Sequence, residues 1–266
     1  MNFILITSLT LILIIIWHFI TWKPISPIFF SNNFIKLGHR GMPVSAPENT
    51  IAGFKKVLNH QIDGIELDVQ FSKDKELIIY HDWDLSNLGF PNKRIDMLDS
   101  KEIKKYFIKD NKNNNHTIPF LDEVLQFFPK NKILNIEIKQ SSIWNTGIEK
   151  KILDRLNNYN LNDNVIISSF NPIVINRVKR INPNIFTAFL WSLETPILPF
   201  NNLIWILLAK PDGFNPDIKY INKNILKWVK LKKMKIISFT INNPSDLQKA
   251  INLDIDGIIT DDPNIN

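Results

Sequence analysis

From residue 34 onward, short apolar runs alternate with longer segments whose apolar positions recur at helical spacing. Strands are predicted at residues 34–38, 62–71, 77–80, 133–138, 165–169, 185–190, 212–214, 235–240 and 257–259. Helices are predicted at residues 50–59, 100–106, 121–128, 146–157, 172–181, 196–209, 222–232 and 244–251. Repeated strand-then-helix units favour a parallel sheet, and their number and total length suit a (βα)₈ TIM-type barrel of the α/β class.

Nine predicted strands are one too many for this barrel. Only residues 72–76 separate the second from the third, whereas a parallel crossover needs a dozen or more residues. The third strand, 77–80, is therefore predicted to return antiparallel beside the second and to bring His81 over the mouth of the barrel.

Residues 3–20 are almost wholly apolar, which is about the length that spans a bilayer core. Trp17 and Trp22 lie at one end, where an interfacial aromatic belt is expected. A cleavable signal peptide is the alternative, but neither a basic segment before the run nor an Ala-x-Ala site after it is present. The sequence thus predicts a transmembrane anchor at 1–22, a linker at 23–33 and a catalytic barrel at 34–266.

The net charge of +6 belongs entirely to the part of the chain after the apolar run, since no charged residue precedes Lys23. Lys23 and Lys36 follow the predicted anchor, so the positive-inside rule orients the barrel towards the cytoplasm. A basic domain favours an anionic membrane surface or an anionic substrate. Nucleic acid is disfavoured, because no basic stripe is interleaved with aromatic residues. The chain has no cysteine, which excludes disulfides and thiolate metal sites.

Three carboxylates in two predicted strands indicate a metal site. Glu66 and Asp68 are two positions apart and share a strand face, as do Glu137 and Lys139. Neighbouring carboxylates repel at neutral pH, and a bound cation relieves that repulsion. An oxygen-rich set favours Mg²⁺ or Ca²⁺ over zinc and leaves the choice between them open. The alternative is that these acids lie on a solvated strand face.

An ordered set of motifs covers most of the chain. The motifs are HRG at 39–41, PENT at 47–50, ELDVQ at 66–70, HD at 81–82, IPFLDEVL at 118–125, NIEIK at 135–139, SF at 169–170, FTIN at 239–242 and DGIITDDP at 256–263. In this set the chain resembles the glycerophosphodiester phosphodiesterase family from about residue 35 to 263. The family uses a TIM-type barrel, which agrees with the strand count.

The resemblance implies roles for individual residues. Those implied are an acid/base pair, His39 and His81, metal ligands Glu66, Asp68 and Glu137, phosphate contacts from Arg40 and Lys139, and a substrate-binding wall at Phe239. Glu48, within PENT, is expected either to support a catalytic histidine or to cap the following helix. The implied reaction is attack by the glycerol 2-hydroxyl, followed by opening of a cyclic phosphate with water. His18, His60 and His116 are not expected in the site.

The chain also departs from the family. Many relatives carry Trp where Phe239 stands, and the Arg that often follows HD is missing. Residues 85–117 are too few for a sizeable cap subdomain, and an apolar run at 197–209 suggests a lipid-facing rim. The prediction is a metal-dependent phosphodiesterase that releases glycerol 3-phosphate and an alcohol from glycerophosphodiesters. The alternatives are a lysophospholipase D acting on membrane lysophospholipids and an inert membrane-tethered binding barrel. A phospholipase C of the phosphoinositide type fits the motifs less well.

Overall fold

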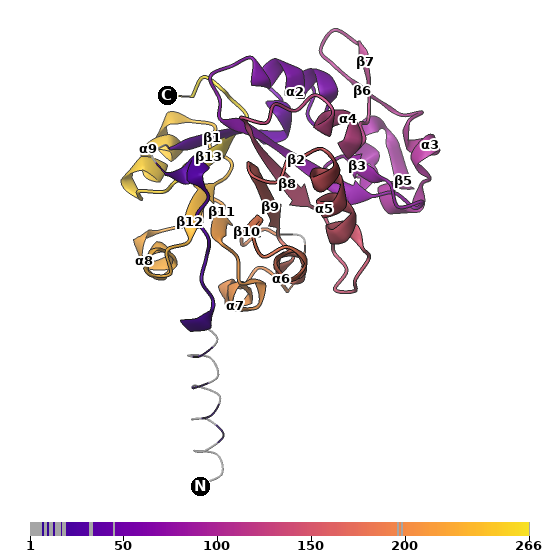
Figure 1. The fold of residues 1–266 in the computed structure, drawn as a ribbon. Coiled ribbons are helices and arrows are strands. Elements are labelled where there is room, and N and C mark those ends of the chain that lie inside the picture. Colours follow the sequence, from indigo (N-terminus) through magenta and orange to yellow (C-terminus); the bar gives the residue numbers. More distant parts are fainter. Residues whose placement is uncertain are drawn as a thin grey trace.

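Eight parallel strands close into a barrel (Figure 1). The computed structural model describes residues 7, 10, 13, 17, 20–31, 34–44, 46–195, 197 and 199–265. Around the barrel the strands run β1 (Ile35–Gly38), β2 (Gly64–Phe71), β8 (Ile133–Ile138), β9 (Val165–Ser169), β10 (Phe186–Trp191), β11 (Gly213–Pro216), β12 (Lys235–Ser238) and β13 (Gly257–Thr260). Pairing of β1 with β13 closes the barrel, and the predicted (βα)₈ fold is confirmed.

Helices follow the strands and cover the outside of the barrel (Figure 1). They are α2 (Ile51–Leu58), α4 (Leu121–Leu125), α5 (Ile148–Asn158), α6 (Pro172–Ile181), α7 (Ile206–Ala209), α8 (Lys223–Leu231) and α9 (Pro244–Asn252). Their starts follow capping chemistry. Thr50 accepts a hydrogen bond from the Gly53 amide before α2, and Asn171 and Asn243 cap helices that begin with proline. Each helix buries one apolar stripe against the strands.

The third predicted strand behaves as expected. Strand β3 (Leu77–Ile79) pairs antiparallel with the end of β2, with Val69 opposite Ile79. The polar stretch after it forms two small hairpins that the sequence did not predict. They pair β4 (Asp84–Leu85) with β5 (Phe90–Arg94) and β6 (Phe107–Lys109) with β7 (Asn115–Thr117), with α3 (Ser100–Ile103) between them. We call residues 84–117 the insertion, which lies on the far side of the barrel from α8 and α9 (Figure 1).

The amino-terminal end of the barrel is filled by aromatic and aliphatic side chains. Phe30, from the short 3₁₀ helix η1 (Ile28–Phe30), packs on Phe186 with ring centroids 5.1 Å apart, beside Ile35 and Ile133. The indole of Trp22 is buried and donates to the Pro211 carbonyl at 3.0 Å. Phe30 of the predicted linker therefore packs as the base of the barrel, and Trp22, which was expected at a membrane interface, is instead buried against the barrel. The boundaries at 22/23 and 33/34 stay a prediction.

Within the described residues, no helix is long and apolar enough to cross a membrane. The predicted anchor at 1–22 falls mostly outside them. The predicted helix at 196–209 is shorter than expected, with a 3₁₀ turn η5 (Leu203–Trp205) followed by α7. Phe200 of that run is buried, whereas Ile204 is 63% exposed. The run is therefore partly core and partly surface.

Candidate active site

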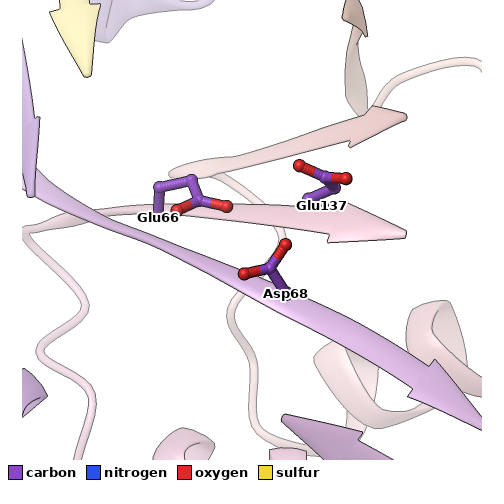
Figure 2. A group of neighbouring side chains, drawn as sticks. All are labelled: Glu66, Asp68 and Glu137. Carbon is purple, nitrogen blue, oxygen red and sulfur yellow. The ribbon is translucent and has the colours of Figure 1, made fainter. Parts of the chain in front are cut away.

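Three carboxylates converge inside the mouth of the barrel. Glu66 and Asp68 come from β2 and Glu137 from the adjacent β8, where Asp68 and Glu137 are in register (Figure 2). One oxygen of each lies within 4.8 Å of the other two. Strand alternation points all three inwards. The close approach of β2 and β8 depends on Gly64, because a β-carbon there would lie 1.9 Å from the Ile133 carbonyl oxygen.

The carboxylates do not share one environment. Burial, with Asp68 and Glu137 nearby, raises the pKa of Glu66 well above its usual value, and burial also raises the pKa of Glu137. Burial alone would raise the pKa of Asp68 as well, but Lys139, Arg40 and His81 hold it well below its usual range. The cluster therefore contains more negative charge than its neighbours neutralise.

The donor set fits a hard divalent cation. Oδ1 of Asp68 is buried and accepts no hydrogen bond in the described part of the chain, since the ammonium of Lys139 lies 3.7 Å away, beyond hydrogen-bond distance. A buried carboxylate oxygen without a donor is costly unless something else binds it. Carboxylate oxygens at this spacing are the ligands that Mg²⁺ and Ca²⁺ prefer.

Two cations border the cluster. Nε of Arg40 lies 3.3 Å from Asp68 Oδ2, and Nη1 lies 3.2 Å from Glu48 Oε2. The Arg40 amide also donates to Glu66 Oε2 at 3.0 Å. Lys139 Nζ lies 3.6 Å from Glu137 Oε1. Arg40 adopts a left-handed backbone conformation with φ of 50°, and in this conformation its amide contacts Glu66 while its side chain contacts Asp68.

His39 is held by a carboxylate and an amide. Its Nδ1 lies 2.6 Å from Asp261 Oδ1, and Asn242 Nδ2 donates to Asp261 Oδ2 at 2.5 Å. Although burial opposes it, the bond from His39 lowers the pKa of Asp261. With Nδ1 occupied, Nε2 is the nitrogen available for proton transfer.

His81 is held in the same way from other elements. Its Nδ1 lies 2.7 Å from Asp82 Oδ1, and Asn87 Nδ2 donates to Asp82 Oδ2 at 2.5 Å. The backbone on both sides of His81 is held by Gln70, whose side-chain amide donates to the carbonyls of Tyr80 and Asp82 at 2.8 Å each. Both histidines thus have a carboxylate on Nδ1 that is itself held by an asparagine.

A cavity of about 400 Å³ joins these groups. Seven of the nine predicted site residues line it: His39, Arg40, Glu66, His81, Glu137, Lys139 and Phe239. The other two, Asp68 and Glu48, contact Arg40 from outside the lining. Phe239 packs edge-on against Phe170 with centroids 5.9 Å apart. Lys139 Nζ lies 5.6 Å from the ring centroid of Trp83, which the sequence reasoning missed.

Asp261, Asp82 and their asparagines were missed as well. Asp82 directly follows His81, and Asp261 lies in the matched motif near the carboxyl terminus, so the motifs contained the signal. The histidines outside the prediction lie elsewhere. His116 pairs with Asp110 in the insertion at 3.3 Å, and His60 follows α2. His18 is outside the described residues.

Comparison with known proteins decides the family. Residues 39–265 match the glycerophosphoryl diester phosphodiesterase family. The chain belongs to this family, which confirms the predicted resemblance. A glycerophosphodiester phosphodiesterase of Caldanaerobacter subterraneus subsp. tengcongensis is 33% identical over 235 residues, covering 85% of this chain and 93% of the relative.

Solved structures agree on the fold. A glycerophosphodiester phosphodiesterase of Thermotoga maritima is 26% identical with a TM-score of 0.69, covering 87% of this chain and 96% of that one. An Oleispira antarctica phosphodiesterase, solved with the product sn-glycerol-3-phosphate, is 24% identical with a TM-score of 0.72. It covers 86% of this chain, and the match spans 93% of that protein.

Proposed function

We propose that this protein is a metal-dependent glycerophosphodiester phosphodiesterase that releases glycerol 3-phosphate and an alcohol. One observation carries the proposal. Two carboxylate-held histidines, an arginine and two acids of the three-acid cluster line one cavity at the carboxyl ends of the strands, and the third acid lies directly behind them. Family membership and the activity named for the Caldanaerobacter relative support it.

Glu66, Asp68 and Glu137 would hold the cation, either Mg²⁺ or Ca²⁺. When bound, it supplies positive charge to a phosphoryl oxygen and so favours attack at phosphorus. Arg40 contributes a planar fork and Lys139 a point charge for the remaining phosphoryl oxygens. Glu48 holds Nη1 of Arg40 and thereby positions that fork.

The histidines move the protons. The Nε2 of one accepts a proton from the glycerol 2-hydroxyl as its oxygen attacks phosphorus, and the other protonates the departing alcohol oxygen. The products of this step are the alcohol and a cyclic phosphate. Water then opens the ring with the two roles exchanged, which returns both histidines to their starting states and releases glycerol 3-phosphate. Phe239 and Phe170 offer an apolar wall to the carbon atoms of the substrate.

The test is product analysis with glycerophosphocholine and lysophosphatidylcholine as parallel substrates. The proposal expects glycerol 3-phosphate and choline from the first. Phosphocholine as the product would indicate cleavage on the other side of phosphorus, and hydrolysis of neither diester would contradict the proposal.

The lysophospholipase D alternative has one supporting observation. Ile197 lines the cavity, and Ile204, farther along the same segment, is exposed, so this segment has apolar side chains both in the cavity and on the surface. Together with the apolar sequence at 3–20, this favours an anchored enzyme that reaches lipid substrates, and Lys23 and Lys36 after that run would orient it towards the cytoplasm. Preferential hydrolysis of lysophosphatidylcholine in vesicles by the full chain, lost when Ile197 is changed to Ser, would support it. Equal hydrolysis of lysophosphatidylcholine by the wild-type chain and by Ile197→Ser would contradict the lysophospholipase D alternative.

A further inference from the structure

A groove of about 720 Å³ crosses the insertion and adjoins the candidate active site. Asp82, which holds His81, belongs to the lining of both hollows. Glu48 and Tyr80 form the near part of the groove, and the insertion supplies the rest, from the turn before β5, the start of β5, β6 with the residues just before it, and the start of β7. A volume of this size accommodates a ligand as large as a small organic molecule. The groove therefore lies next to the candidate active site, and Asp82 is part of the wall of both.

The walls of the groove combine aromatic surface with positive charge. Phe90 packs edge-on against Tyr106, with ring centroids 4.7 Å apart. The side chains of Phe90 and Phe107 are each more than two fifths exposed. Lys105 and Lys109 stand on the same lining. Large exposed aromatic side chains beside cations are typical of binding surfaces.

These two lysines differ from Lys93 and Lys104 of the insertion, which are already paired. Lys93 Nζ lies 3.1 Å from Glu102 Oε1, and Lys104 pairs with Glu123. Neither Lys105 nor Lys109 forms an ion pair or hydrogen bond through its ammonium group with the residues the structure describes. The acids on the near wall are already engaged, Glu48 by Arg40 and Asp82 by His81 and Asn87. The groove therefore has positive charge left for a ligand.

We infer that this groove binds the alcohol part of a diester substrate when that alcohol itself carries a second phosphate or phosphodiester. The inference rests on the proposed function and specifies its substrate class. The cavity holds the scissile phosphate and its glycerol, and the continuation beyond Asp82 receives the rest of the molecule. The second phosphate meets Lys105 and Lys109, while the carbons between the phosphates lie against Phe90 and Phe107.

The experiment compares two diesters that differ by one phosphate, glycerophosphoglycerol and its terminally phosphorylated form. For the wild-type chain, kcat/KM is expected to be about tenfold higher for the phosphorylated diester, because two surface cations contribute on the order of a tenfold preference. The advantage falls as ionic strength rises, since exposed charges are screened. Lys105→Ser/Lys109→Ser brings the ratio to about one and leaves turnover of glycerophosphoglycerol unchanged.

The matched control is Lys101→Ser/Lys112→Ser, which removes the same charge from the insertion outside this groove. It should keep the tenfold ratio. A wild-type ratio near one, or an equal loss in the control, would overturn the inference. Calorimetric binding of the phosphorylated diester to each variant separates this result from failure of the proposed function. If neither diester is hydrolysed, the proposed reaction fails, while tighter binding to wild type than to the groove variant still supports the groove.

Discussion

The two ends of the barrel interior differ sharply, although the same strands build both. At the base, Phe30, Phe186, Ile35 and Ile133 fill the space with buried apolar side chains. At the mouth the inward positions carry acids, histidines and cations around a cavity. Alternation along each strand sends every second residue into this interior, so one β2 strand supplies Gly64 to the base and Glu66 and Asp68 to the mouth. Apolar burial at the base stabilises the folded chain, and this stabilisation offsets the cost of keeping like charges buried and close together at the mouth.

Phe186→Ala tests the base. Removing a large buried ring should lower the free energy of unfolding by about 3–5 kcal/mol, because contacts are lost and a cavity remains. Denaturant unfolding measures this change, and kcat at a temperature where the variant is folded should match wild type. Phe90→Ala, at an exposed site, is the control and should cost less than about 1 kcal/mol. A stability loss as small as that of the control would mean that the base does not hold the barrel.

His39→Ala tests the mouth, where we expect turnover to fall and stability to stay close to wild type. Turnover of glycerophosphocholine should fall at least ~100-fold, the usual scale of acid/base catalysis, while the unfolding midpoint stays close to wild type. His81→Ala should behave alike. His116→Ala removes a histidine that also faces a carboxylate but lies in the insertion, and it should leave turnover unchanged. Wild-type turnover in either mouth variant would remove that histidine from the mechanism.

Asp261→Asn should have a smaller kinetic effect, because it alters only how His39 is held. We expect kcat to fall about tenfold, because the His39 imidazole is no longer held in one orientation by a carboxylate. Asp110→Asn makes the equivalent change beside His116 and should leave kcat unchanged. Wild-type kcat in Asp261→Asn would show that this carboxylate does not position His39.

The same variant has a pH-dependent effect on stability. The pKa of Asp261 is lowered in the folded chain, so the unfolded chain binds more protons there in the acid range. Its carboxylate therefore stabilises the fold fully above the unfolded value of about 3.9, and this contribution is lost as pH falls through the folded pKa. Asp261→Asn should cost up to about 1 kcal/mol at pH 7, and this cost should shrink as the pH falls below about 3.9, as measured by urea unfolding. A cost that stays the same at acid pH would contradict this.

The periodicity of apolar residues and the order of the motifs were sufficient to predict the barrel fold. The spacing between residues 71 and 77 predicted the antiparallel return of β3, which is confirmed, and the ordered motifs predicted the family. The two hairpins of the insertion were missed because their strands are only two to five residues long, with no alternation strong enough to indicate a hairpin.

Within the site, the sequence located the acids but not what holds the histidines. Glu66 and Asp68 are two positions apart in one strand, so their shared face follows from local geometry. Asp261 is 222 positions from His39, and only closure of β1 against β13 brings the two together. The predicted roles of the site residues and the choice between Mg²⁺ and Ca²⁺ stay predictions, because they depend on chemistry that neither spacing nor side-chain position determines.

The central claim is that the three-acid cluster holds a cation on which hydrolysis depends. The most direct measurement is turnover of glycerophosphocholine by the full chain after chelation and dialysis, with metal content checked by elemental analysis, and again after adding Mg²⁺ or Ca²⁺. The account predicts that turnover falls to background without metal and returns with one of these ions in wild type, but does not return in Glu66→Gln/Glu137→Gln. Full turnover by protein that elemental analysis shows to be free of metal would contradict it.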